Sequence, residues 1–346
     1  MQAKTFIIGI HGLGNKPPRG VLERWWRLSL SEGLRRHTGK RPFFDFRLVY
    51  WADYLNPEPT DPNEKDPEHP LYLTEPYHTA LEETDAAGDG HDAPRPFKKK
   101  VKSQLTRMLL SDPFMHAFPA VTESVMKKRF KEIELYYSSD AVGKAKATAQ
   151  EELRSILSEA LAKYRKRRIV LIGHSMGSLI ACDVLYSLGF EIDTFITAGS
   201  PLGIPLIAEK IREEQCAAVA SQGGQDSHSG HNGHGGHNKD KKLKAPEAIT
   251  GAWYNLYDPQ DELACHYRLG EVFAHNSAGV APQDLEVTND YRIGERVNPH
   301  KIYGYLRCRE ISEILLKLIT ANKSERRLRA ENGISDILFK LGRWFH

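Results

Sequence analysis

A serine between two glycines is the residue of this chain best placed to do chemistry. Residues 173–177 read Gly-His-Ser-Met-Gly and directly follow the apolar run 169–172. This G-x-S-x-G pattern is the sequence form of a nucleophile elbow, a sharp turn from a strand into a helix that exposes the serine hydroxyl. Glycines flank the serine because the turn brings the backbone too close to its neighbours for a Cβ. Ser175 is therefore the candidate nucleophile.

The segments on either side of Ser175 supply the elements that an elbow requires. Consecutive Ile, Val and Leu residues at 169–172 are typical of a parallel strand buried on both faces. After the elbow, apolar residues recur at helical spacing at Leu179, Ile180, Val184, Leu185 and Leu188. The sequence thus predicts strand, elbow and helix in the required order.

A serine hydroxyl is a weak nucleophile at neutral pH, so it needs a base and a third group that orients the base. We expect the acid on the loop after the predicted strand 253–257, where Asp258 and Asp261 lie. Asp261 is favoured because a short turn separates it from the strand end. Asp258 is closer to the strand and better suited to shape the turn, and it stays the alternative.

The base has to be chosen from 15 histidines. His266 and His275 follow the acid too closely to begin a separate loop. His300 lies between the irregular segment 288–297 and an apolar helix, which is where we expect the base. Its imidazole would accept the Ser175 proton, and the acid would fix its tautomer.

An oxyanion hole needs two N–H donors. One candidate is the backbone N–H of Met176, which directly follows the serine at a helix N-terminus. The other is the N–H of Leu13, with Gly12 next, in the turn His-Gly-Leu-Gly-Asn after the predicted strand 5–10. A dinucleotide site at this turn is discounted because the turn is not G-x-G-x-x-G.

Four segments together resemble the α/β-hydrolase superfamily, and most closely its lipase-like serine esterases. They are Ile-His-Gly-Leu-Gly at 10–14, Gly-His-Ser-Met-Gly at 173–177, Ala-Gly-Ser-Pro-Leu-Gly at 198–203 and Tyr-Asp-Pro-Gln-Asp at 257–261. The resemblance covers residues 4–50 and 165–320. It implies an α/β-hydrolase fold, with a mostly parallel central sheet flanked by helices.

The resemblance also implies an activity. A protein similar to these esterases would cleave carboxylic esters, lipid esters included, through an acyl-enzyme on a Ser-His-Asp triad, with no cofactor and no metal. Its substrate-binding residues would be His11, Gly12, His174 and Leu202. Two alternatives stay open: an acyltransferase or thioesterase on the same triad, and a catalytically silent scaffold used for binding.

We expect one α/β domain over residues 1–346, interrupted by an insertion at 56–137 before the nucleophile strand. Strands are predicted at 5–10, 44–50, 169–172, 194–197 and 253–257, and helices at 22–34 and 150–163. Residues 56–96 have the composition of an irregular segment. Residues 97–137 are basic and amphipathic, and we predict that they form a lid whose apolar side binds an acyl chain.

Residues 221–244 are rich in glycine, histidine and lysine. His228, His231, His234 and His237 recur every third residue, which raises a metal site as an alternative. We favour a flexible loop, because the intervening glycines disfavour a helix that would align the rings.

Composition limits the partners. A net charge of +3, from 48 basic and 45 acidic residues, gives no argument for nucleic acid. A short apolar N-terminus and four scattered cysteines, Cys182, Cys216, Cys265 and Cys308, favour a cytoplasmic protein with reduced thiols.

Residues 334–345 are amphipathic, like residues 97–137. Packing on the domain is favoured for them, with peripheral membrane contact as the alternative.

Overall fold

The chain folds around a sheet of parallel strands. A computed structural model describes residues 3–80, 136–137, 148–222, 242–264 and 268–321. Within these ranges, six strands form the central sheet in the order β2-β1-β3-β4-β6-β8, and every neighbouring pair is parallel. The strands are β1 (Thr5–Ile10), β2 (Asp45–Val49), β3 (Arg168–His174), β4 (Ile192–Ala198), β6 (Ile249–Tyr257) and β8 (Pro282–Glu286).

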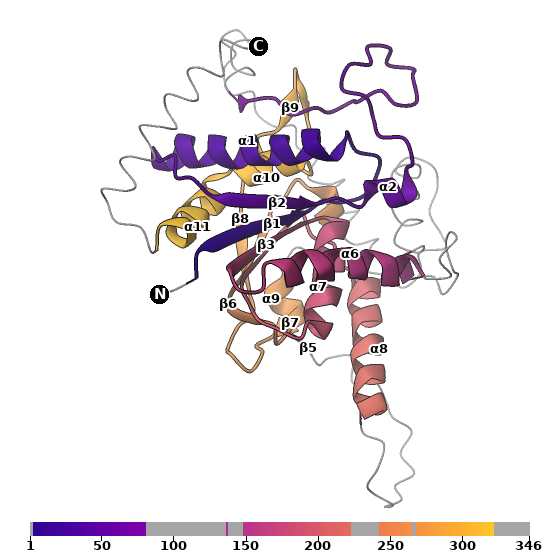
Figure 1. Ribbon diagram of the computed structural model, residues 1–346, viewed down its shortest axis with the longest axis vertical. Helices are drawn as coiled ribbons and strands as arrows, with labels where there is room; N and C mark the ends of the chain where they lie inside the picture. Colours follow the sequence, from indigo (N-terminus) through magenta and orange to yellow (C-terminus); the bar gives the residue numbers. More distant parts are fainter. Residues whose placement is uncertain (1–2, 81–135, 138–147, 223–241, 265–267, 322–346) are drawn as a thin grey trace, which may run out of the picture.

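Helices cover both faces of the sheet (Figure 1). One face carries α1 (Arg19–Thr38), α10 (Ile302–Arg307) and α11 (Arg309–Thr320). The other carries α6 (Ala149–Lys163), α7 (Met176–Ser187) and α8 (Pro205–Gln222). Strand side chains alternate between the faces, so Ile7 and Val170 pack toward α1 while Ile8 and Leu171 pack toward α7.

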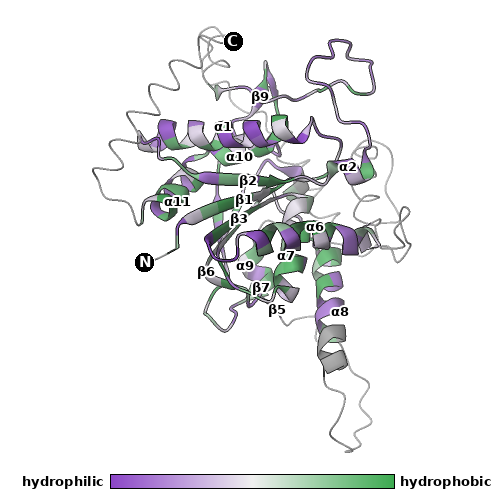
Figure 2. Cartoon of the chain, in the orientation of Figure 1, coloured by the Kyte–Doolittle hydropathy of each residue, from purple (hydrophilic) through white to green (hydrophobic). Residues whose placement is uncertain are grey.

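Burial on both faces explains why the central strands β1 and β3 are largely apolar. These two strands are mostly hydrophobic, whereas α1 and α6 alternate between hydrophobic and hydrophilic residues (Figure 2). The expected strands and the helices expected at 22–34 and 150–163 are confirmed, with ends that differ by a few residues. The one apolar helix expected after His300 is instead two, α10 and α11, which meet at Cys308. The α/β class with a parallel central sheet flanked by helices is therefore confirmed.

Strand β8 is an element that the sequence pattern did not predict. It lies at the edge of the sheet, begins with Pro282 and is only partly buried, so it lacks the apolar run of a central strand. The segment 288–297, expected to be irregular, contains the short pair β9 (Arg292–Ile293) and β10 (Arg296–Val297). The other short elements are α2 (Ala52–Leu55), β5 (Leu243–Lys244), the 3₁₀ turn Glu262–Ala264, α9 (Leu269–Val272) and β7 (Phe273–Ala274).

The strand order changes direction at β1. The chain passes from β1 to β2 on one side, and β3 then pairs with β1 on the other side. In open parallel sheets, ligands bind outside the carboxyl ends of the strands at such a switch point. The two loops that meet there are the turn after β1, which begins at His11, and the elbow after β3, which contains Ser175.

Residues 56–80, the described first part of the insertion, form no helix or strand but are fixed to the domain. The carboxylate of Glu32 in α1 accepts hydrogen bonds from the Tyr77 hydroxyl and the Ala80 N–H, each at 2.8 Å. Arg307 in α10 donates to the His78 carbonyl at 2.7 Å. The predicted irregular backbone is observed here, yet it is tied to α1 and α10 and reaches the edge of the site.

Several predictions fall outside the described residues. These are nearly all of the predicted lid at 97–137, the four spaced histidines, Cys265 and the amphipathic end at 334–345. The described cysteines, Cys182, Cys216 and Cys308, are free thiols. No helix in the described ranges is long and apolar enough to cross a membrane.

We expect Gly177→Ala to lower the free energy of unfolding by about 3 kcal/mol or more. A Cβ at this position would lie 2.4 Å from the Ile10 carbonyl oxygen and 2.6 Å from that of His11, so the backbone itself would have to move. Gly20→Ala in α1 is the control, since its Cβ would meet no atom within 4 Å. Urea unfolding of both variants checks the prediction, and equal midpoints would contradict it.

Candidate active site

Ser175 lies at the end of β3 in a strained backbone conformation. Its φ is 51° and its ψ is −127°, and among the described residues it is the only non-glycine residue with positive φ. A Cβ on Gly173 would lie 2.6 Å from the Ser178 Cα. Together with the contacts at Gly177, this meets the steric requirement from which the elbow was predicted.

His300 and Asp261 form a buried pair. Nδ1 of His300 lies 2.9 Å and 2.8 Å from the two carboxylate oxygens of Asp261, whose side chain is fully buried. A carboxylate can only accept, so Nδ1 carries the proton and Nε2 is left as the acceptor. The loop before α10 thus brings the predicted base to the predicted acid on the loop after β6.

Two residues that sequence reasoning did not select hold this pair. The Tyr305 hydroxyl donates to Asp261 Oδ2 at 2.8 Å and accepts the Asp258 N–H at 3.1 Å. Burial, followed by the charge of Asp261, raises the pKa of Tyr305 well above its ordinary value, so the hydroxyl stays a donor. Gly199, with φ 55°, leaves room for the pair, because a Cβ there would lie 2.8 Å from Asp261 Oδ2.

Asp258 has a different set of partners. Its carboxylate accepts the N–H of Asn289 at 2.8 Å and the N–H of Gln260 at 2.8 Å. These bonds close the turn after β6 and tie it to the chain beyond β8. The structure therefore brings Asp261, and not Asp258, to His300.

The two histidines expected to contact substrate are held by protein groups. Nε2 of His174 donates to the His300 carbonyl at 2.8 Å, so the residue before the serine helps to position the loop of the base. His11 bonds the Gly12 carbonyl through Nδ1 at 2.8 Å and accepts the Trp51 N–H through Nε2 at 3.1 Å. Burial, and then the charge of Lys16, lower the pKa of His11 to about 3, so it is neutral.

The predicted oxyanion donors lie at the same end of the sheet. Met176 is the first residue of α7, where the helix leaves backbone N–H groups without an intrahelical acceptor. The turn after β1 runs directly against the elbow, since a Cβ on Gly12 would lie 2.8 Å from the Ser175 Cβ. Among the described residues, neither the Met176 N–H nor the Leu13 N–H donates to a protein acceptor.

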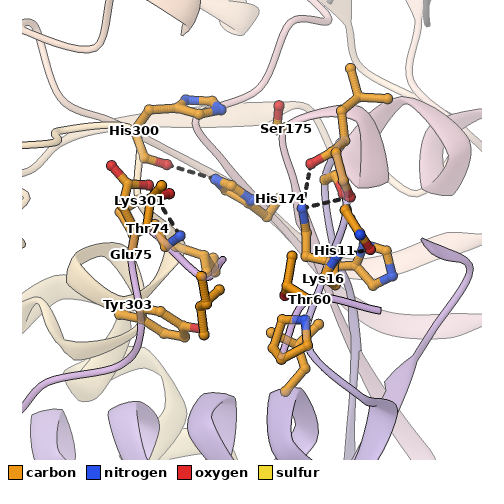
Figure 3. A pocket seen from close by; sticks show the side chains of 18 of the residues that line it. His11, Lys16, Thr60, Thr74, Glu75, His174, Ser175, His300, Lys301 and Tyr303 are labelled. Atoms are coloured by element: carbon orange, nitrogen blue, oxygen red, sulfur yellow. Dashed lines mark hydrogen bonds and ion pairs between the residues drawn. The ribbon is translucent and has the colours of Figure 1, made fainter. Parts of the chain in front are cut away.

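A cavity of about 210 Å³ opens beside Ser175. Figure 3 shows the His300 imidazole at the same end of this cavity as Ser175, on the side that faces the serine. Nε2 of His300 is buried and has no hydrogen-bond partner among the described residues. No hydrogen bond joins Nε2 to the Ser175 hydroxyl, and such contacts commonly tighten only when substrate binds.

The cavity has two walls (Figure 3). One is the turn after β1 with Lys16 and Thr60, and the other contains Glu75 and Lys301. His11, Gly12, Leu13 and His174 line it as expected. Leu202 does not, because it is fully buried in the core on the α7 face of the sheet.

The wall residues Thr60, Glu75 and Lys301 were not selected from the sequence. Thr60 and Glu75 lie in a stretch whose composition indicates only irregular structure, and Lys301 reads as an ordinary surface lysine. The position of Lys301 next to His300 was the one available signal.

No group of three or more metal-ligating side chains occurs among the described residues. Neither a comparison of the chain with protein-family models nor one with curated proteins gives a match.

Proposed function

We propose that this protein is a serine hydrolase of the α/β-hydrolase type that cleaves carboxylic esters through an acyl-enzyme. The observation that carries the proposal is the His300 imidazole. Its Nδ1 is fixed by the buried Asp261, and its unpartnered Nε2 lies at the cavity that contains Ser175. The parallel sheet and the strained serine at the end of β3 are compatible with it.

In the first half of the reaction, the Ser175 hydroxyl attacks the ester carbonyl carbon and its proton passes to His300 Nε2. The carbonyl oxygen becomes an oxyanion, which the N–H groups of Met176 and Leu13 would stabilise. Asp261 stabilises the imidazolium that forms. When the carbon–oxygen bond to the alcohol breaks, His300 returns the proton to the leaving oxygen.

In the second half, water attacks the acyl-enzyme and gives its proton to His300 Nε2. The bond to Ser175 Oγ then breaks, and the proton returns to that oxygen as the acid leaves. No oxidant or reductant is needed for these steps, because the elements of water are divided between the acid and the alcohol.

Covalent labelling tests the proposal most directly. A fluorophosphonate probe should modify one residue of the purified full-length protein, identified as Ser175 by peptide mass spectrometry, because an activated serine attacks phosphorus as it attacks an ester. Ser178→Ala is the matched control and should be labelled like the wild type. The Ser178 hydroxyl is hydrogen-bonded to Ser175 O and Ser200 Oγ, so it should not be the group that reacts. Labelling that persists in Ser175→Ala would overturn the proposal.

Tyr305→Phe should lower kcat for a short p-nitrophenyl ester about 3- to 10-fold in steady-state kinetics. The Tyr305 hydroxyl donates to Asp261 Oδ2, so without it the carboxylate is held less firmly toward His300 Nδ1. Tyr136→Phe, which removes a buried bond to Asp183 on α7, is the control and should keep kcat within about twofold of the wild type. Equal kcat values in all three proteins would contradict this role.

A further inference from the structure

The loop that presents His300 is held by a side chain of the insertion, Glu75. Its carboxylate accepts from Asn298 Nδ2 at 2.7 Å and from Lys301 Nζ at 3.2 Å. Asn298 lies two residues before the proposed base, and Lys301 directly follows it. Figure 3 shows Glu75 and Lys301 on the same side of the cavity as His300. The stretch 56–80 therefore contacts the loop of the base on both sides of His300.

Asn298 connects Glu75 to the backbone of His300. Its Oδ1 accepts the His300 N–H at 3.0 Å, while its Nδ2 donates to Glu75. An amide has one acceptor oxygen and one donor group, and a carboxylate can only accept, so Glu75 selects the orientation in which Oδ1 faces His300. The Asn298 carbonyl accepts the Lys301 N–H at 3.1 Å, which closes the turn around the base. Glu75 thus fixes the amide that holds the His300 backbone.

The contact from Glu75 is made by an ionised group. Burial opposes ionisation, but the charge of Lys301 and the hydrogen bond from Asn298 outweigh it and hold the pKa of Glu75 below its ordinary value. An ionised acceptor makes shorter and stronger hydrogen bonds than a neutral one. The Glu75 side chain is 19% exposed and that of Lys301 is 23% exposed, so water screens their interaction only in part. The hydrogen bond that Glu75 accepts from Asn298 is therefore a strong one.

The backbone that follows Glu75 is anchored to the domain. The Tyr291 hydroxyl donates to the Pro76 carbonyl at 2.6 Å. Arg307 in α10 donates to the carbonyl of His78, two residues further along. A side chain holds a neighbour in place only when its own position is fixed by surrounding contacts. Glu75 meets this condition.

We propose that Glu75 is a positioning residue of the active site, which acts through Asn298 to hold the loop of His300 in place for catalysis. His300 Nε2 has no hydrogen-bond partner among the described residues, so its position beside Ser175 depends on Asp261 and on the loop backbone. A small displacement of a catalytic group lowers the rate steeply. This inference rests on the proposed esterase function and adds to it a residue from a segment that the resemblance to esterases does not cover.

Steady-state kinetics of the full-length protein with a short p-nitrophenyl ester test this role. Glu75→Ala should lower kcat about 5- to 10-fold and leave KM within about twofold of the wild type, because the base shifts while the cavity still admits the ester. Asn298→Ala breaks the same path from its other end and should lower kcat by a similar factor, so it keeps the test decisive if Glu75→Ala is unstable. The double variant should be no slower than Asn298→Ala, because both changes interrupt one path.

Glu75→Gln separates the hydrogen bond from the charge. Its amide oxygen can still accept from Asn298, so kcat should stay within about twofold of the wild type. Tyr77→Phe is the matched control, because it removes another hydrogen bond of the same stretch, to Glu32 in α1 and away from the cavity lining. It should leave kcat unchanged.

Four kinetic results would overturn the inference. They are a wild-type kcat in Glu75→Ala, equal losses in Glu75→Ala and Tyr77→Phe, additive losses in the double variant, and a Glu75→Gln variant as slow as Glu75→Ala. Thermal melts of each variant ensure that folded proteins are compared.

Hydrogen exchange measured by NMR gives a readout that needs no turnover. The Nδ1–H of His300 exchanges with water when its bond to Asp261 opens. In protein with isotope-labelled histidine, this signal should exchange at least about threefold faster in Glu75→Ala than in the wild type or in Tyr77→Phe. Equal exchange in all three proteins would contradict the inference even where Ser175 is labelled. Faster exchange in a protein whose Ser175 neither labels nor turns over would contradict only the esterase function.

Discussion

Replacing Ser175 by alanine is expected to lower kcat for a short p-nitrophenyl ester by about 10⁴-fold or more. The variant lacks the oxygen that forms the acyl-enzyme, and the members of a triad act as a unit, so His300 and Asp261 cannot compensate. The Oγ atom makes no hydrogen bond to a described residue, so its loss should leave the fold intact. Steady-state kinetics with matched thermal melts would measure both effects.

The control for this loss is Ser178→Ala, three residues along α7. Its hydroxyl is also buried, and it bonds Ser175 O and Ser200 Oγ, so the variant tests general disturbance of the elbow. We expect it to keep activity within about tenfold of the wild type. Activity of the wild-type level in Ser175→Ala would exclude Ser175 as the nucleophile.

Asp261→Asn should lower kcat about 10³- to 10⁴-fold, and Asp258→Asn at most about tenfold. An amide at 261 keeps the shape of the carboxylate but removes the charge that stabilises the imidazolium and selects its tautomer. Asp258 instead accepts two backbone N–H groups, from Gln260 and Asn289. An asparagine there keeps one acceptor oxygen, so its cost should fall mainly on stability, about 1 to 3 kcal/mol.

The two aspartates are three residues apart on one turn, so each variant serves as the control for the other. Kinetics must be read with the melting temperature, because Asp258→Asn could lose activity through unfolding at the assay temperature. Measuring both variants well below their melting temperatures separates the effects. A larger loss of kcat in folded Asp258→Asn than in folded Asp261→Asn would transfer the role of acid to Asp258.

The sequence by itself determined the local elements of this protein, the strand and tight turn around Ser175 and the order of strands and helices along the chain. The apolar run 169–172 and the two glycines around Ser175 specify a buried strand and a tight turn, because hard steric limits act over a few bonds. The parallel α/β architecture followed from the alternation of apolar strands and amphipathic helices. The edge strand β8 escaped prediction because an edge strand needs no apolar run.

Only the tertiary structure decided which distant residues meet. Asp261 and Asp258 are equivalent by position on the turn, and the direction of their side chains, set by Tyr305 and Asn289, brings one of them to His300. The cavity wall at 56–80 has no periodicity to reveal it, because it is neither helix nor strand and is fixed by hydrogen bonds to α1 and α10. Contacts between loops far apart in the chain depend on where the whole sheet places their ends, and a local pattern does not encode that.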